Sequence, residues 1–193
     1  MKLFAEPLIV LDTETTGVHK EAEVIELGAV CLDEWGRLRS SFSALIAPSS
    51  PDIFQDWRVK KALSVSNIEI DDLLQAPSLE EVRTAFQAWI DKVPAQKKTC
   101  LAFNAKFDKK RLEEAGLHLN WGKCILEMSK EIMNDKGHVV VDKNGRKKQP
   151  SLKDSCAFFG VVYPENAHRA LEDAIATAQV ACKAFPLWRQ SLS

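Results

Sequence analysis

Apolar runs near the start of the chain predict three successive strands. Residues 8–11 are uninterrupted apolar side chains, typical of a strand that is buried on both faces. Residues 24–32 and 38–46 predict a second and a third strand, and residues 33–36 between them have the composition of a hairpin turn. A loop rich in proline and serine at residues 48–51 closes this block.

The next apolar positions recur at helical spacing. Ser78 and Glu81 form a capping box at the start of a helix. Its apolar face is made by Leu79, Val82, Phe86, Trp89, Ile90 and Val93. Residues 99–103 predict a fourth strand, and Asn104 is placed to cap a helix that ends near Glu114.

Three more helices are expected in the last third of the chain. They cover residues 121–134, residues 151–160 with Ser151 as the cap, and the alanine-rich residues 167–184, which Pro186 would end. Strands in succession, followed by alternating strands and helices, predict an α/β sheet with an antiparallel edge.

The composition fits one globular domain that covers residues 1–193, with 46% hydrophobic and 27% charged residues. The net charge of −1 neither supports nor excludes a nucleic-acid substrate, although proteins that grip long duplexes are usually basic. Five scattered cysteines suit neither a disulfide framework nor a zinc site, so a reducing cytoplasm is expected. No apolar segment has the length of a membrane span.

Two carboxylates follow the first strand. Asp12 and Glu14 are two residues apart, so on an extended chain they lie on the same side. A carboxylate at the end of a buried strand is costly unless a positive group pairs with it, and a divalent cation can do so. The alternative is a solvated strand end in a threonine-rich turn.

A third carboxylate is expected on the inward face of a helix. Asp108 shares a helical stripe with Leu112 and Ala115, where a lone acid is unusual. The bases around it would hold phosphates or form the wet face of the helix: Lys106, Lys109, Lys110 and Arg111. An ion pair between Asp108 and one of these bases is the alternative to a functional site.

The last helix supplies a fourth acid and a histidine. Asp173 lies on a stripe of small side chains, which allows the helix to approach the sheet closely. His168 is five residues earlier, about 140° around an ideal helix, so it is expected at or before the first turn. A lone histidine near a helix start is more often a surface residue than a catalytic one.

These three segments together resemble the exonuclease motifs of the DEDDh family, which includes the proofreading subunit of bacterial DNA polymerase III and several RNA-trimming enzymes. The matching stretches are Asp12-Thr-Glu-Thr-Thr-Gly, Asn104-Ala-Lys-Phe-Asp108 and His168-Arg-Ala-Leu-Glu-Asp173. They occur in the family order within a core of residues 8–184. The resemblance implies a single exonuclease domain with a ribonuclease-H-like fold, in which helices flank a mixed five-stranded sheet.

The resemblance also implies a 3′–5′ exonuclease that releases nucleoside 5′-monophosphates by a two-metal-ion mechanism. The two Mg²⁺ ions, or Mn²⁺ as an alternative, would be held by Asp12, Glu14, Asp108 and Asp173. His168 would be the general base toward the attacking water. The expected substrate contacts are Thr13, Thr15, Thr16, Gly17 and Asn104.

Three departures from the family pattern leave the substrate open. Phe103 stands where relatives often carry histidine, and residues 65–68 replace a frequent His-Gly pair. Residues 137–149 look like an insertion, predicted as a basic hairpin with a two-residue turn at Asn144 and Gly145. This hairpin would be either a solvated arm or a contact to the nucleic-acid backbone.

Single-stranded DNA is the expected substrate, because the motifs most resemble those of proofreading enzymes. An exoribonuclease that trims short RNA is the runner-up. A catalytically silent interaction module is expected to have lost at least one of the five motif residues, and none is missing. Neither a polymerase partner nor a homodimer is indicated, and the tryptophans are expected to serve packing: Trp35, Trp57, Trp89, Trp121 and Trp188.

Overall fold

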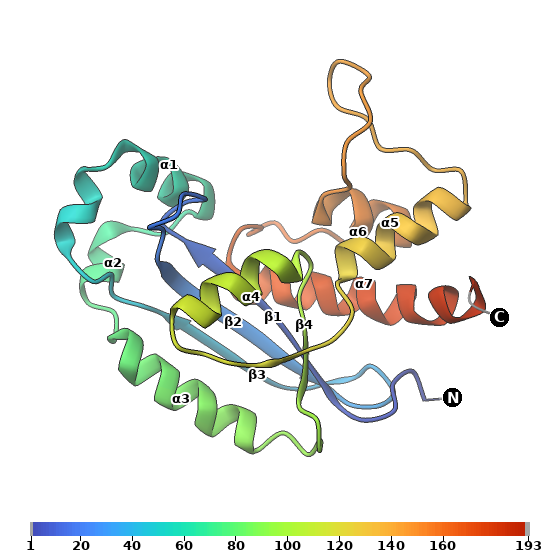
Figure 1. The fold of residues 1–193 in the computed structure, drawn as a ribbon, viewed down its shortest axis with the longest axis horizontal. Helices are drawn as coiled ribbons and strands as arrows, with labels where there is room; N and C mark the ends of the chain where they lie inside the picture. The colour runs from blue at the N-terminus through green and yellow to red at the C-terminus, as the bar shows by residue number, and fades with distance from the viewer. Residues whose placement is uncertain (1, 192–193) are drawn as a thin grey trace.

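A mixed five-stranded sheet with helices on both faces organises the computed structural model, which describes residues 2–191 (Figure 1). The order across the sheet is β3-β2-β1-β4-β5, with β1 antiparallel to β2 and parallel to β4. The strands are β1 (Leu8–Thr15), β2 (Val24–Leu32), β3 (Leu38–Leu45), β4 (Thr99–Leu101) and β5 (Asn120–Trp121). The predicted architecture is therefore confirmed.

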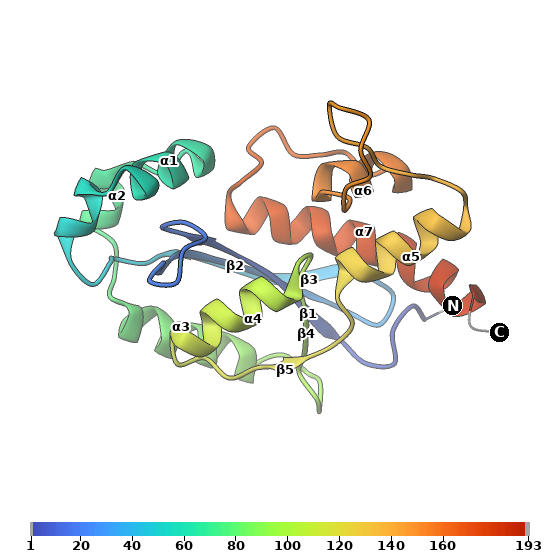
Figure 2. The same cartoon turned by 45° about the horizontal axis from the view of Figure 1, so that its top comes forward.

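Helices cover the two faces of the sheet in separate layers (Figure 2). Ile9 and Leu11 of β1 pack on the layer of α3 and α4, whereas Leu8 and Val10 pack on that of α5, α6 and α7. This alternation explains why β1 begins as a continuous apolar run. The helical elements are η1 (Pro51–Gln55), α1 (Trp57–Ser66), α2 (Ile70–Leu74), α3 (Leu79–Asp91), α4 (Ala105–Glu114), α5 (Ile125–Asp135), α6 (Leu152–Phe159) and α7 (Ala170–Ser191).

The first turn of α7 lies directly on the backbone of β2. A Cβ atom built on Gly28 would come within 2.2 Å of the Leu171 backbone nitrogen and 2.3 Å of the Ala170 carbonyl carbon. Only glycine leaves room for this approach, and the small residues on the same side of α7 are buried, as predicted. The contact brings the start of α7 beside the end of β1.

Several predicted boundaries are wrong. The strand predicted at residues 99–103 ends at Leu101, because the carbonyls of Ala102 and Phe103 accept hydrogen bonds from the first turn of α5. The helix predicted at residues 121–134 starts only at Ile125, since Trp121 pairs with β4.

The end predicted for α7 is also wrong. The helix begins at Ala170 rather than residue 167, and it continues past Pro186, which lies inside it. Proline removes one helical hydrogen bond, but Phe185 and Trp188 on either side of it pack against α5 and α6. Packing therefore outweighs the local signal for a helix end.

Two helices, α1 and α2, have no counterpart in the sequence prediction. The Asp56 carboxylate caps α1 by accepting a hydrogen bond from the Arg58 backbone N–H, and Asn67 ends it with a φ of 52°. Val59 and Leu63 bury one face of α1 in a small core of its own. In the sequence, the capping residue Asp56 and the four-residue spacing of Val59 and Leu63 were the signals that could have predicted α1.

The predicted hairpin within residues 137–149 is present in a short form, with one antiparallel bridge, between Val141 and Lys147. Its turn runs from Asp142 to Gly145, because the Gly145 backbone N–H donates to the Asp142 carbonyl at 3.0 Å, so the turn is centred on Lys143 and Asn144 rather than on Asn144 and Gly145. Within residues 2–191, no helix has the length and hydropathy to cross a membrane.

Candidate active site

The first two motif acids point toward α7 from the second half of β1. Asp12 lies opposite Gly28 and Glu14 lies opposite Glu26 in the antiparallel pairing of β1 with β2. Both acids are half-buried and continue the side of β1 that packs on α7. The alternative of a freely solvated strand end therefore does not describe them.

Asp108 joins this group from α4. Its side chain is 3% exposed, and its Oδ1 atom accepts hydrogen bonds from the Thr13 backbone N–H at 3.1 Å and the Thr13 hydroxyl at 2.9 Å. Thr13, predicted as a substrate contact, thus holds the second-motif acid against β1. Among the described residues Lys109, Lys110 and Arg111 pair with Glu113 and Glu114, and none of the four neighbouring bases pairs with Asp108, so the predicted alternative of an ion pair to Asp108 is wrong.

Arg111 has a role that neither sequence interpretation covers. Its buried guanidinium donates to three carbonyls of the segment after β1, those of His19 at 2.6 Å, Lys20 at 3.2 Å and Ala22 at 3.1 Å. Its side chain is almost fully buried and also donates to Glu114, so it is not free to hold a phosphate. Arg111 instead fastens the segment after β1 to the helix that carries Asp108.

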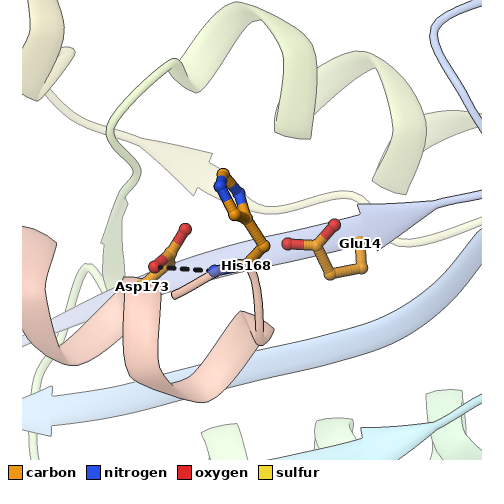
Figure 3. A group of neighbouring side chains, drawn as sticks. All are labelled: Glu14, His168 and Asp173. Carbon is orange, nitrogen blue, oxygen red and sulfur yellow. Dashed lines mark hydrogen bonds between the residues drawn. The ribbon is translucent and has the colours of Figure 1, made fainter. Parts of the chain in front are cut away.

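The third motif completes the cluster at the start of α7. Ligand atoms of Glu14, His168 and Asp173 lie within 4.8 Å of one another. Figure 3 shows the carboxylates of Glu14 and Asp173 on either side of His168, whose backbone N–H donates to Asp173 Oδ1 at 3.4 Å. His168 is exposed and precedes the helix, as predicted, and its φ of 67° is left-handed.

The sequence interpretation missed an ion pair, between the buried Glu26 and the partly exposed Arg169, that holds this segment. Glu26 of β2 is 2% exposed and accepts hydrogen bonds from the Arg169 guanidinium, the shortest at 2.8 Å, and from the Ala170 backbone N–H at 3.0 Å. The residue after His168 and the first residue of α7 are thus tied to β2. The available signal was a single acid inside an otherwise apolar strand.

The acids are crowded enough to oppose one another's ionisation. Burial, then repulsion by Asp108, Glu14 and other acids, holds the pKa of Asp12 well above its usual range. Burial, followed by repulsion from Asp173 and Glu26, raises the pKa of Glu14 to about 8. Burial raises the pKa of Asp108 to about 7, although the Thr13 hydrogen bonds oppose this shift, and burial also raises the pKa of Asp173.

The predicted substrate contacts have mixed outcomes. Asn104 precedes α4 and is exposed, but its side chain makes no capping hydrogen bond, because its φ of −109° and ψ of 65° depart from an extended cap. The Thr15 hydroxyl donates to the Gly17 carbonyl at 2.7 Å, and the Thr16 hydroxyl accepts from the Glu23 backbone N–H at 2.9 Å. These hydroxyls shape the turn.

A cleft of about 510 Å³ opens beside Glu14. Gly17 and Val18 line one wall, and Trp57, Lys61 and Phe107 line others. Trp57 is 70% exposed and Val18 is 88% exposed, so Trp57 does not serve the packing role predicted for it. A flat aromatic ring, an apolar side chain and a lysine next to a cluster of acids suit a nucleotide.

Comparisons with known proteins agree with this geometry. Two curated relatives are DNA polymerase III PolC-type proteins: that of Staphylococcus saprophyticus is 28% identical over 91% of this chain, and that of Clostridium perfringens is 26% identical over 98%. The chain spans only 11% and 12% of their lengths.

Solved structures share the fold at low sequence identity. The nuclease domain of 3'hExo, a DEDDh family member bound to rAMP, matches with a TM-score of 0.65 and 18% identity over 92% of this chain and 90% of that domain. E. coli Exonuclease I with a dT13 oligonucleotide has a TM-score of 0.69 and 14% identity, over 92% of this chain and 40% of the other.

A family model settles the relationship. The model RNase_T, described as exonuclease, matches residues 9–181, which include all three motifs. The resemblance of the motifs to DEDDh exonucleases is thereby confirmed. The chain belongs to the RNase_T exonuclease family.

Proposed function

We propose that this protein is a metal-dependent 3′–5′ exonuclease that removes nucleotides from single-stranded DNA. The proposal rests on the convergence of acids from β1, α4 and α7 with His168 at one end of β1. A cluster of acids with raised pKa values is typical of a catalytic site rather than of a solvated surface.

The donor set suits a hard divalent cation. Four carboxylates repel one another in a partly buried place, and a cation would remove that repulsion. Mg²⁺, with Mn²⁺ as an alternative, would be held as two ions by Asp12, Glu14, Asp108 and Asp173. Cations bound there would offset negative charge on the phosphate and lower the pKa of water.

The chain's own residues have separate tasks in this proposal. Thr13 keeps Asp108 in place, while the pair of Glu26 and Arg169 fixes the segment that carries His168. The His168 ring, exposed beside Glu14 and Asp173, accepts the proton of the attacking water. The products are a nucleoside 5′-monophosphate and a strand shortened at its 3′ end.

The cleft beside Glu14 takes the terminal nucleotide in this proposal. Val18 and Trp57 contact the base, and Lys61 contacts a phosphate. Thr15 and Gly17 line the sugar side, where glycine permits close backbone approach, whereas Thr16 is buried behind them. Asn104, exposed and without a capping bond, is free to donate to the substrate.

The choice of DNA over RNA follows the sequence relatives, which are DNA polymerase III PolC-type proteins. RNA is the second candidate, because the structural neighbour 3'hExo binds rAMP. Both candidates present the same phosphodiester to the acids, so the two differ only at the sugar and base.

The test uses 5′-labelled DNA and RNA oligonucleotides of one sequence, incubated with Mg²⁺ and with a chelator. We expect a ladder of 3′-shortened products that needs the metal and accumulates faster on DNA. The Asp12→Asn variant should make no ladder, whereas Asp135→Asn, an exposed acid outside the cluster, should match the parent. Faster loss of RNA would reverse the substrate assignment, and intact oligonucleotides of both kinds would refute the activity.

A further inference from the structure

A positively charged surface lies outside the acid cluster. It is the loop of residues 137–149 between α5 and α6, here termed the basic arm. The arm has four basic residues, Lys143, Arg146, Lys147 and Lys148, against one acid, in a chain whose net charge is −1. Positive charge is thus concentrated in this segment.

Most of this charge has no counter-ion. Within residues 2–191, Lys143, Arg146 and Lys147 are exposed and make no ion pair. The one acid, Asp142, is occupied by the backbone, because its carboxylate accepts from the N–H groups of Asn144 at 2.8 Å and Arg146 at 2.9 Å. The arm therefore presents cations that are available to an anionic partner.

The arm has a defined conformation. At its base the His138 ring packs on Phe158 with centroids 5.1 Å apart, and the Lys148 ammonium donates to Asp154 of α6 at 2.8 Å. The Lys148 backbone N–H also donates to the Val140 carbonyl at 3.0 Å. A fixed base and a pinned turn lower the entropy cost of binding through the tip.

A cleft of about 380 Å³ lies between the arm and α5. In the described part of the chain, Lys147 contributes a cation without a counter-ion to its lining, and Lys130 and Lys148 contribute cations that are paired with Glu127 and Asp154. Met133 and Val139 contribute apolar surface. Cations around an apolar floor suit a chain of phosphates that carries flat, weakly polar bases. Val139 is 48% exposed and so is accessible to such a ligand.

The arm is also placed to meet a strand that leaves the acid cluster. Figures 1 and 2 both show the arm and α1 rising on the same side of the sheet, with the start of α7 between them. The cleft beside Glu14, at about 510 Å³, has room for a nucleotide and not for a strand. The nucleotides before the terminal one must therefore run over the surface of the protein.

We propose that the basic arm binds the phosphodiester backbone of the substrate several nucleotides before its 3′ end. This inference rests on the proposed exonuclease function. It assigns to the arm a contribution to the affinity for long strands and none to the hydrolytic step. DNA and RNA share the backbone, so the arm serves either one.

The test compares Lys143→Gln/Lys147→Gln with Lys92→Gln/Lys97→Gln, which removes two exposed lysines in the segment between α3 and β4. Hydrolysis of a dinucleotide and a 20-nucleotide single strand is measured in Mg²⁺ at several salt concentrations. For the arm variant we expect KM for the long strand to rise about fivefold, with kcat and dinucleotide hydrolysis unchanged. The slope of log KM against the logarithm of the salt concentration should fall by about 1.4, since each of the two lost phosphate contacts contributes about 0.7 to the slope for a single strand.

The outcomes separate the two proposals. If the parent protein hydrolyses both substrates and the arm variant matches the control, the arm inference is wrong and the exonuclease function stands. An equal decrease in the hydrolysis of the dinucleotide and of the long strand would also overturn the arm inference. If the arm lysines instead govern binding to phosphatidylserine vesicles and leave the long strand unaffected, a membrane is the partner. No hydrolysis by the parent protein would remove both proposals.

Discussion

At the scale of single residues, His168 is held in a conformation that it would not choose freely. Its φ of 67° lies in the left-handed region, which costs a residue with a side chain about 1 kcal/mol or more. Its side chain is exposed, so apolar packing does not offset this cost. The bonds of Glu26 to Arg169 and Ala170 just after it supply the compensation.

Replacing His168 by glycine should therefore separate stability from catalysis. Glycine adopts a positive φ without strain, so we expect Tm to rise by about 2–4 °C in thermal unfolding. Loss of a general base should lower kcat by about 10²- to 10⁴-fold in the oligonucleotide assay. Asn67→Gly is the matched control, because Asn67 has a φ of 52° outside the acid cluster, and its kcat should not change. Unchanged kcat in His168→Gly would exclude the histidine from the reaction.

The sequence reveals residues that stand out from their local pattern. Asp108 is visible as an acid on an apolar stripe, and the motif spacing supplies the rest of the five. Glu26 is visible as a lone acid in an apolar strand, but its bond to Arg169 escapes notice because it joins segments far apart in the chain. The role of Arg111 escapes notice because it acts through backbone carbonyls of a distant segment. Neither a bond to a side chain far away in the sequence nor a bond to a backbone carbonyl changes the spacing of apolar and polar residues from which the elements are predicted.

At the scale of elements, the position of α7 depends on one missing side chain in β2. Gly28→Ala would place a methyl group 2.2 Å from the Leu171 nitrogen, which is backbone and cannot rotate away. We expect α7 to shift and the fold to lose about 1–3 kcal/mol, as other overpacked cores do. Because α7 carries Asp173, kcat should fall as well.

Thermal unfolding and the oligonucleotide assay would measure both effects. Gly137→Ala is the control, since its added methyl group would meet no atom within 4 Å, although its φ of 69° brings some strain. The control should retain full kcat. A stable and fully active Gly28→Ala variant would show that the position of α7 tolerates movement.

Long, strongly patterned elements were predictable, and short ones were not. The capping box and apolar face of α3 predict that helix, β1 begins with four apolar residues, and β2 is apolar apart from Glu26 and Gly28. The strand β5 has only two residues and exists because it pairs with β4. The continuation of α7 beyond Pro186 likewise depends on contacts with α5 that lie outside any local window.

At the scale of the whole molecule, the acids should make stability depend on pH and metal. Burial and repulsion raise the pKa of Glu14 from 4.5 to about 8 and that of Asp108 from 3.8 to about 7. A carboxyl with a raised folded pKa stabilises the fold below its unfolded pKa, and this contribution is lost as the pH rises through the folded pKa.

Tm of the metal-free protein should therefore fall between about pH 5 and pH 8, at about 2–4 °C for each kcal/mol lost. Mg²⁺ should restore stability, more at about pH 8 than at pH 5, because it binds the ionised carboxylates. Scanning calorimetry with and without Mg²⁺ measures both trends. The double variant Glu14→Gln/Asp108→Asn should weaken them, and a metal-free Tm that rises over this range would contradict the assignment.

The acids that would perform the cleavage are spread along most of the chain, with Asp12 and Glu14 on β1 and Asp173 on α7. During translation the ribosome delivers the first pair early and the last partner late. A nascent chain therefore lacks the complete acid cluster until synthesis has passed Asp173 and α7 has docked on β2.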